Sequence, residues 1–336
     1  MRPRRDQFSG CLIGQTLGDA AGFVVEGFSP EASARYVEDY LKTDKAGDFG
    51  RFPFAFGQYS DDSQLARELM QSYAQKTYFD PADYALRITR IFSEKRIVGF
   101  GYSTKEAAKK LMLGISWEES GVLPPCAGNG SSMRAAPVGL FFFDEPRKLI
   151  QAAHDQGRIT HRDPRCSAGA VAIGGAVGMV LQENELDPNR LLSTLAEWAA
   201  EFDRDFADGI RSIPGYLSLP PEQAARLIAD IGIDADYIDD EEWKGVPGYV
   251  MSSVLWSLYA FFRTPADYWE TICTAIAAGG DTDTTAAMAG AISGAYLGIG
   301  ALPHRLTGYL TDRGTWKRDA LTELAYRCYD IKMRQA

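Results

Sequence analysis

The sequence predicts an all-α protein, folded as a compact single-domain orthogonal helical bundle. Apolar residues recur at helical spacing along almost the whole chain, so that each stretch has one apolar face. No series of alternating strands interrupts this pattern, and two helical stretches carry glycine at every fourth position. With 336 residues the chain is long for one domain, but its 46% of hydrophobic residues are enough for one sizeable core, and we expect residues 1–336 to form it.

Several stretches between the chain ends show the helical spacing clearly. In the first of them, Leu65, Leu69 and Tyr73 recur on one face. The stretch 103–114 has Ser103 as its expected N-cap and ends at Gly114. The expected helices cover residues 61–75, 81–94, 103–114, 163–182, 188–202, 221–232, 249–262 and 265–278.

Two further helical stretches, one near each end of the chain, are striped with glycine. Glycine inside a helix costs about 1 kcal/mol relative to alanine, so the stripes need a reason. A helix face without side chains lets two backbones approach closely, as the centre of a tight bundle requires. Both striped helices also bring acidic residues to one end. The stripes are Gly10, Gly14, Gly18 and Gly22, and Gly290, Gly294 and Gly298.

The least regular segment is residues 204–247, which we interpret as a variable, loop-rich insertion rather than a second domain. Its acidic patch has two interpretations, a cation site or a solvated, mobile loop. The loop is favoured, because neither a glycine turn nor a fixed ligand spacing supports a calcium site. The patch consists of Asp234, Asp236, Asp239, Asp240, Glu241 and Glu242.

Composition argues against several classes of protein. The formal net charge of −10 argues against general nucleic-acid binding, which needs a basic face. The five cysteines lie far apart without a CxxC pair, so they suggest neither a zinc site nor a disulfide framework. Their odd number fits a reducing cytoplasm. They are Cys11, Cys126, Cys166, Cys273 and Cys328.

No segment is expected to enter a membrane. The N-terminus starts like a secretory signal, but Gln15 and Asp19 interrupt its apolar stretch. The run 284–302 is long enough to span a bilayer, yet alanine and glycine dominate it and its drive to insert is weak. We therefore interpret this run as a buried helix and the chain as a cytoplasmic protein.

Two clusters of hydroxyl and carboxylate side chains stand at expected helix starts near opposite ends of the chain. They are Ser60, Asp61 and Asp62, and Asp281, Asp283 and Thr284. One interpretation is helix capping, in which each acid of the first turn contributes about 0.3–1 kcal/mol. The other is metal binding, because carboxylate and hydroxyl oxygens suit hard cations such as Mg²⁺. Either cluster alone favours capping. Together, four carboxylates would repel one another unless two divalent ions lay between them, which predicts a central binuclear metal site.

The chain resembles the ADP-ribosylglycohydrolase family in five motifs that follow one another in the family's order. They are "GCLIGQTLGDAAGFVVEG", "YSDDSQ", "CAGNGSSMRAAPVG", "ITHRDP" and "GGDTDTTAAMAG". The resemblance runs through nearly the whole chain, and it implies an all-α fold around two Mg²⁺ or Mn²⁺ ions. Two departures are visible: Ser60 stands where many members have threonine, and residues 204–247 match least.

The resemblance also implies the site residues. Both hydroxyl and carboxylate clusters would bind the two metal ions, and Glu26 would occupy an acidic flap. Glu26 and Asp62 are the candidates for acid and base catalysis. The residues expected to contact ADP-ribose are Gly101, Cys126, Ala127, Asn129, Gly130, Ser131, Met133 and His161. For the glycine-rich loop a plain loop remains the alternative to a phosphate site, and for His161 a structural histidine.

The activity implied by the resemblance is hydrolysis of the bond between ADP-ribose and a protein side chain, which releases ADP-ribose. Arginine is the favoured acceptor, because the chain is compact and shows no extra domain. An ADP-ribosylated protein would then be its partner. Two other classes stay open: a two-metal phosphohydrolase of a free nucleotide, and a non-enzymatic protein that binds ADP-ribose or blocks a partner.

Overall fold

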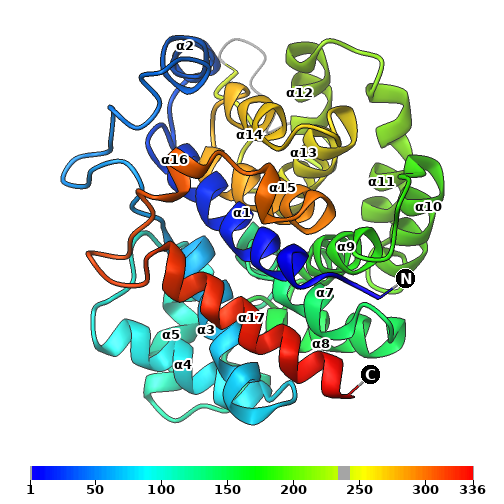
Figure 1. Cartoon of the computed structure of the whole chain (residues 1–336). Helices are drawn as coiled ribbons and strands as arrows, with labels where there is room; N and C mark the ends of the chain where they lie inside the picture. Colours follow the sequence, from blue (N-terminus) through cyan, green and yellow to red (C-terminus); the bar gives the residue numbers. More distant parts are fainter. Residues whose placement is uncertain (1, 234–242, 336) are drawn as a thin grey trace.

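Helices make up the regular structure of residues 2–233 and 243–335, which this computed structural model describes (Figure 1). These residues form no strand, only isolated β-bridges, so the all-α prediction is confirmed. The α-helices are α1 (Arg5–Phe23), α2 (Pro30–Tyr36), α3 (Asp61–Lys76), α4 (Pro81–Ser93), α5 (Tyr102–Met112), α6 (Trp117–Ser120), α7 (Ala136–Phe142), α8 (Pro146–Arg158), α9 (Pro164–Val180), α10 (Pro188–Ala199), α11 (Arg204–Tyr216), α12 (Pro221–Ala229), α13 (Val250–Arg263), α14 (Tyr268–Ala277), α15 (Thr282–Leu297), α16 (His304–Thr307) and α17 (Arg318–Gln335). Short π- and 3₁₀-helical turns are η1 (Val37–Leu41), η2 (Asn129–Ser131) and η4 (Ile299–Ala301).

The two glycine-striped helices, α1 and α15, pack directly against each other at the centre of the molecule (Figure 1). A Cβ atom added to any of the four glycines of α1 would overlap a backbone oxygen of α15. The facing pairs are Gly10 with Gly294, Gly14 with Gly290, Gly18 with Ala286, and Gly22 with Thr282. The predicted close approach of two backbones is confirmed, and we call this contact the glycine seam.

Other helices surround the glycine seam and hold it in place. α15 also packs against α9, α13 and α14, while α1 packs against α3 and α17. The buried Tyr268 of α14 donates a hydrogen bond from its hydroxyl to the carbonyl oxygen of Gly14 at 2.7 Å. At the far end of the seam, the Thr282 hydroxyl donates to the Gly22 carbonyl at 2.8 Å. The N-terminus of α15 is therefore fixed beside the C-terminus of α1.

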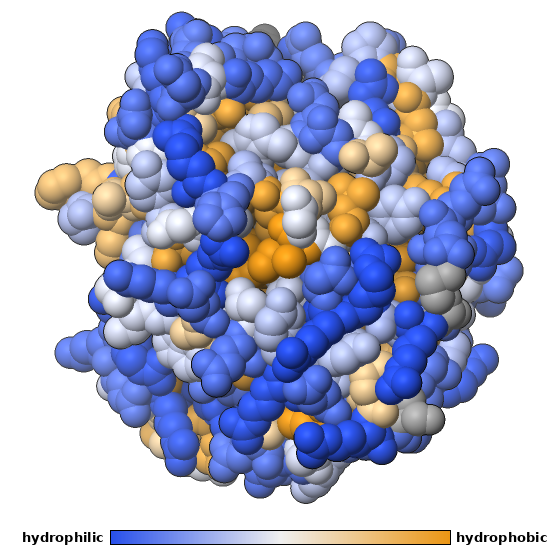
Figure 2. All heavy atoms as spheres, viewed as in Figure 1, coloured by the Kyte–Doolittle hydropathy of each residue, from blue (hydrophilic) through white to orange (hydrophobic). Residues whose placement is uncertain are grey.

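The run 284–302 is a buried helix, as predicted, but only over part of its length. α15 ends at Leu297, and Gly298 turns the chain with a φ of 85°. Gly298 therefore lies beyond the helix that its stripe predicted. No helix among residues 2–233 and 243–335 is long and apolar enough to cross a membrane. Figure 2 shows one face of the molecule, on which hydrophilic residues predominate and apolar residues gather near the centre.

Two expectations about local structure are corrected. The N-cap of α5 is Gly101, not Ser103, because the helix already begins at Tyr102 and encloses Ser103. Residues 204–216 are not a loop, since they form α11, whereas α12 (Pro221–Ala229) covers most of the helix expected at 221–232. α11 begins where the Asp203 side chain accepts a hydrogen bond from the Phe206 N–H at 2.7 Å, and its apolar face is buried. The acidic patch of residues 234–242 lies outside the described residues.

The glycine seam predicts that an added methyl group is not tolerated. Gly14→Ala should lower the free energy of unfolding by about 1–3 kcal/mol or more, because the facing backbone leaves no room for it. Gly215→Ala in α11 is the matched control, since no atom lies within 4 Å of a Cβ there. That change should keep or raise stability by up to about 1 kcal/mol. Chemical denaturation followed by circular dichroism measures both, and equal effects would contradict a tight seam.

Candidate active site

A cavity of about 670 Å³ opens where the ends of α1, α3 and α15 meet. This volume is typical of small-molecule sites, which span about 300–1,000 Å³. Most of the predicted site residues line it, namely Glu26, Asp61, Asp62, Gly101, Cys126, Asn129, Gly130, Met133, His161, Asp281, Asp283 and Thr284. Ser60, Ala127 and Ser131 do not. One cavity therefore unites both carboxylate motifs with the glycine-rich loop.

The carboxylates are crowded and partly withdrawn from water. Oxygen atoms of Glu26, Asp281 and Asp283 lie within 4.8 Å of one another. Burial, reinforced by neighbouring carboxylates, raises the pKa of Asp62 and Asp283 well above its usual value. The same two causes raise the pKa of Asp61 to about 8. We call Glu26, Asp61, Asp62, Asp281 and Asp283 the acid cluster.

The structure separates helix capping from other roles in the two motifs. Ser60 is the N-cap of α3, where its hydroxyl accepts from the Asp62 N–H at 3.3 Å and donates to Asp62 Oδ2 at 2.9 Å. Capping is therefore confirmed for Ser60, whose hydroxyl is turned toward its own helix. Asp281 occupies the N-cap of α15, but its side chain caps no N–H of that helix. Capping is wrong for Asp281, so its carboxylate needs another explanation.

Asp19 is a member of the site that the sequence interpretation missed. It is fully buried on α1, where its two carboxylate oxygens accept hydrogen bonds from the N–H groups of Ser60 at 2.8 Å and Ser63 at 3.0 Å. Burial raises the pKa of Asp19 to about 6, although these hydrogen bonds oppose the shift. Asp19 thereby attaches the start of α3 to α1. The signal was present, since an acid that interrupts an apolar helix must have partners.

Arg51 is a second residue that the sequence did not reveal. Its guanidinium donates to Glu26 Oε2 at 2.7 Å and to the backbone oxygens of Glu26 and Phe23 at 3.3 and 3.1 Å. Burial raises the pKa of Glu26, while the charge of Arg51 opposes that shift. The proposed flap carboxylate is thus held by a cation from another loop. The Glu26 carboxylate lies within 4.8 Å of those of Asp281 and Asp283. From the sequence alone, Glu26 was assigned to catalysis and not to the metal ligands.

The glycine-rich loop, residues 126–133, is joined to the acid cluster by Asn129. The Asn129 side chain donates to Asp281 Oδ2 at 2.6 Å and to the Ser253 hydroxyl at 3.2 Å. Its backbone N–H donates to the Gly248 carbonyl at 3.1 Å. Both amide hydrogens of the side chain are thereby used, so Asn129 orients a carboxylate as well as lining the cavity.

Two residues of the loop, Ala127 and Ser131, are not part of the cavity wall. The buried Ser131 hydroxyl donates to the Cys166 carbonyl at 2.8 Å, because Ser131 lies on the inner side of the short turn η2. The Ala127 carbonyl accepts from the Val250 N–H at 2.9 Å and fastens the loop to α13. Both residues therefore support the loop, and their contact with ADP-ribose stays a prediction.

His161 is buried against the loop and lines the cavity. A Cβ atom at Gly130 would lie 2.7 Å from His161 Cε1, so a side chain there would have to displace the imidazole. Burial, helped by the charge of Arg134, lowers the pKa of His161 to about 3. The imidazole is therefore neutral at physiological pH. From the sequence alone, ligand contact and a structural role were alternatives for His161. In the structure His161 lines the cavity and also packs against the loop.

The residues present fit a divalent cation. Asp62 Oδ1 is buried and has no hydrogen-bond partner among the residues that the structure describes. The Thr284 hydroxyl lines the cavity and makes no hydrogen bond to the described residues. Oxygen donors at the N-terminus of a helix, crowded by like charges, are the ligands that hard cations select. A cation would also remove the repulsion that raises the pKa values of the acid cluster.

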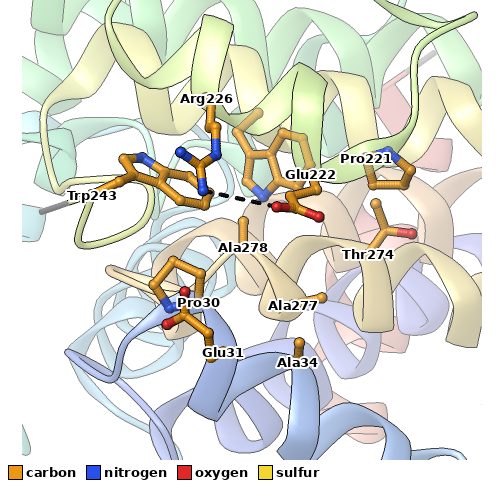
Figure 3. A pocket seen from close by; sticks show the side chains of 11 residues that line it. Pro30, Glu31, Ala34, Pro221, Glu222, Arg226, Trp243, Thr274, Ala277 and Ala278 are labelled. Carbon is orange, nitrogen blue, oxygen red and sulfur yellow. Dashed lines mark ion pairs between the residues drawn. The ribbon is translucent and has the colours of Figure 1, made fainter. Parts of the chain in front are cut away.

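A second cavity, of about 330 Å³, lies between α2, α12 and α14 (Figure 3). Its walls are mostly apolar and include Pro30, Trp243 and Ala278. Arg226 and Glu222 form an ion pair there at 3.8 Å. None of the predicted site residues lines this cavity, so the acid-walled cavity of about 670 Å³ is the candidate active site.

Comparison with known proteins decides which family the chain represents. The model of the family described as ADP-ribosylglycohydrolase matches residues 1–335. The chain belongs to the ADP-ribosylglycohydrolase family. The family resemblance of its motifs is thereby confirmed, and the glycohydrolase class of enzyme follows from membership.

Relatives of this ADP-ribosylglycohydrolase include two named enzymes. ADP-ribosylhydrolase ARH3 of Xenopus tropicalis is 27% identical over 332 residues, which span 88% of this chain and 89% of the relative. ADP-ribosylarginine hydrolase Tri1 of Pseudomonas putida (strain GB-1) is 26% identical over 89% of this chain and 72% of its own. A solved structure titled "ADP-ribosylglycohydrolase-related protein complex" superposes with a TM-score of 0.72 at 26% identity, covering 99% of this chain and all of the other.

The acid cluster predicts an unusual dependence of stability on pH in metal-free protein. Asp19 and Asp61 keep their protons up to about pH 6 and about pH 8 in the folded state, but lose them near pH 3.8 when unfolded. The folded state therefore binds more protons between these values, and the free energy of unfolding should fall as pH rises from about 4 to about 8. Mg²⁺ should restore stability at pH 8 and have little effect at pH 4.

Urea denaturation in EDTA, repeated at several pH values, measures this dependence. Asp61→Asn serves as the internal comparison, because it removes one raised pKa and should flatten the fall. Stability that rises with pH in EDTA, in the unmodified protein, would contradict the electrostatic account of the site.

Proposed function

We propose that this ADP-ribosylglycohydrolase releases ADP-ribose from a modified protein side chain, with two Mg²⁺ or Mn²⁺ ions in its acid cluster. The observation that carries the proposal is the meeting of both carboxylate motifs and the glycine-rich loop in one cavity. Family membership and the names of the relatives ARH3 and Tri1 support hydrolysis of an ADP-ribosyl bond. The partner is an ADP-ribosylated protein, and free ADP-ribose is the product.

The proposed metal ligands come from the two helix starts. Support for them is the unpartnered Asp62 Oδ1, the Thr284 hydroxyl and the failure of Asp281 to cap its helix. When bound, the ions would supply Lewis acidity and the positive charge that the crowded carboxylates lack. The full proposed set is Ser60, Asp61, Asp62, Asp281, Asp283 and Thr284, in which the Ser60 hydroxyl must turn away from Asp62 Oδ2 to reach an ion.

Asp62 and Glu26 are the proposed acid and base. Hydrolysis of a glycosidic bond needs one group that takes a proton from water and one that gives a proton to the leaving atom. Asp62 lines the cavity, and its Oδ1 accepts no hydrogen bond from the described residues, so this carboxylate has an oxygen that is free to face the substrate or its attacking water. Glu26 lines the cavity while Arg51 holds its Oε2 at 2.7 Å, so its carboxylate is oriented before substrate arrives.

We propose arginine as the acceptor. The relative Tri1 is named an ADP-ribosylarginine hydrolase. Phe100 and Tyr102 line the cavity and remain 47% and 68% exposed. Aromatic faces attract a guanidinium group, and so do the nearby carboxylates. The cavity entrance thus offers an environment suited to a modified arginine.

We also propose one domain for residues 1–336 and a cytoplasmic location. The family match extends over residues 1–335, and the buried core residues form one cluster. All five cysteines are free thiols, as is usual in a reducing compartment.

A product analysis tests the proposed function. The protein is incubated with arginine-linked and serine-linked ADP-ribosyl peptides, each in EDTA, Mg²⁺ or Mn²⁺, and the products are identified by mass spectrometry. We expect ADP-ribose from the arginine-linked peptide and only with metal. Release from the serine-linked peptide alone would overturn the acceptor. Release of AMP or phosphate from free nucleotide would indicate a two-metal phosphohydrolase, and binding without release would indicate a non-enzymatic protein.

Matched substitutions at two helix N-caps separate metal binding from capping. Asp281 and Asp267 are the N-cap residues of α15 and α14, but only the Asp267 side chain caps, accepting from the Glu270 N–H at 3.0 Å. Asparagine also caps helices, so Asp267→Asn keeps its cap, and Asp281→Asn removes none because Asp281 caps no N–H; both variants should fold with stability changed by less than about 1 kcal/mol.

Titration calorimetry with Mg²⁺ distinguishes the two variants. Asp281→Asn should lose binding of at least one ion and with it ADP-ribose release, whereas Asp267→Asn should retain both. If Asp281→Asn binds the same number of ions as the unmodified protein, Asp281 is not a metal ligand.

A further inference from the structure

Arg134 is a buried cation that forms no ion pair with a carboxylate of the described residues. It follows the glycine-rich loop directly, and its side chain is 0% exposed. The guanidinium donates from Nε to Gln156 Oε1 at 3.0 Å, and from Nη2 to the Gln156 carbonyl at 3.0 Å and Thr160 Oγ1 at 2.7 Å. Nη1 has no hydrogen-bond partner among the described residues. Burying an unpaired charge is costly, so a side chain with these contacts needs a role beyond packing.

Thr160 connects this cation to His161. Its hydroxyl oxygen accepts from Arg134 and lies 2.7 Å from His161 Nδ1. The other possible acceptor for the hydroxyl proton is the Gly157 carbonyl, at 3.5 Å. That carbonyl already accepts the N–H groups of Thr160 at 3.1 Å and His161 at 3.0 Å, which use both of its lone pairs. The Thr160 hydroxyl therefore donates to His161 Nδ1.

This direction of donation fixes the tautomer of the imidazole. Since Nδ1 accepts, the single proton of the neutral ring lies on Nε2. His161 Nε2 faces the glycine-rich loop, because a Cβ atom at Gly130 would lie 3.1 Å from it and one at Gly128 3.6 Å. All three residues line the cavity. Nε2 makes no hydrogen bond within the described part of the chain, so its proton remains available to a ligand.

We infer that Arg134 is a positioning residue, which acts through Thr160 to hold His161 as a fixed hydrogen-bond donor at the cavity wall. The ligand group that meets His161 is then a hydrogen-bond acceptor, such as a phosphate or hydroxyl oxygen. The identity of that ligand as ADP-ribose rests on the proposed function, whereas the tautomer does not. His161 is accordingly neither a general base nor a metal ligand through Nε2.

Nitrogen NMR of the histidine rings in ligand-free protein tests the tautomer directly. The chain has only three histidines, so His154→Gln and His304→Gln assign the spectrum. His304 is an internal reference for the opposite tautomer. Its Nε2 lies 2.7 Å from the Arg318 guanidinium, which can only donate, so this Nε2 must accept. We expect a protonated Nε2 in His161 and a protonated Nδ1 in neutral His304. A protonated Nδ1 in His161 would overturn the inference.

Two variants of Thr160 test the connection. Thr160→Ser keeps the hydroxyl and should keep the Nε2–H tautomer, whereas the nearly isosteric Thr160→Val removes the donor to Nδ1 and should give a mixture of tautomers. The dissociation constant for ADP-ribose should rise by about 2- to 10-fold in Thr160→Val, the effect of one hydrogen bond, and stay near normal in Thr160→Ser. An unchanged tautomer in folded Thr160→Val would overturn the role of Thr160.

Arg134→Met tests the cation itself, with Arg134→Lys as the variant that keeps the charge. If Arg134→Met is folded and its His161 tautomer is mixed, the assignment of Arg134 is supported; an unchanged tautomer overturns it. Should Arg134→Met fail to fold, the Thr160 pair still decides whether the hydroxyl fixes the ring. A protein with the expected tautomer that does not bind ADP-ribose would contradict the proposed function and leave the inference supported.

Discussion

The candidate site depends on one packing constraint, the contact of α1 and α15 without side chains between them. Backbone oxygens of α15 occupy the space where side chains of α1 would stand. This contact brings Asp19 near the end of α1 and Asp283 at the start of α15 into one buried region. α3 is then fastened to the same place, because Asp19 accepts the N–H groups of Ser60 and Ser63. The acid cluster is thus a consequence of how closely two helices approach.

The carboxylates of the acid cluster repel one another, and only some of them have a cation or a hydrogen-bond donor beside them. Arg51 neutralises Glu26, and Asn129 donates to Asp281 at 2.6 Å. Within the described part of the chain Asp62 and Asp283 receive no comparable cation, and burial with neighbouring charge raises the pKa of both. Without metal, Asp62 and Asp283 would be protonated and therefore uncharged. With a divalent cation bound, both could stay ionised carboxylates. The cavity is therefore organised for a positive charge that the chain does not itself supply.

Sequence alone predicted the parts of this protein that depend on local pattern. Helical spacing located α3, α4, α9, α10, α13 and α14 to within a few residues, and the glycine stripes predicted the central contact. The prediction failed for α11, which lies in the segment that we interpreted as loop-rich and which contains Pro214 within the helix. Pro214 falls in the last turn of that helix, and the burial of Phe206, Ile210 and Ile213 stabilises the rest. Tertiary packing outweighed local propensity there.

In the candidate active site, the motifs predicted which residues lie close together. They did not predict the hydrogen bonds and ion pairs that fix the positions of these residues. Arg51 and Glu26 are joined across loops that have no periodic pattern, so no spacing could pair them. The glycine-rich loop was interpreted as a ligand-binding segment throughout. In the structure Ser131 supports the loop from inside and Asn129 orients a carboxylate. Such roles depend on the direction of a side chain, which follows from three-dimensional packing rather than from residue type.

Backbone pairing links the segment that carries Glu26 to the segment that carries Asp281. The Gly27 N–H donates to the Gly280 carbonyl at 2.8 Å, and the Gly280 N–H donates back to Phe28 at 3.1 Å. Gly280 has a φ of 79°, and an added Cβ would overlap the oxygen of Val246, so only glycine allows this pairing. A displacement of Glu26 by more than a side-chain rotation must break these hydrogen bonds or move Asp281 as well. The glycines that precede the second carboxylate motif therefore couple the proposed flap to the acid cluster, and the position of Glu26 is not independent of the residues it faces.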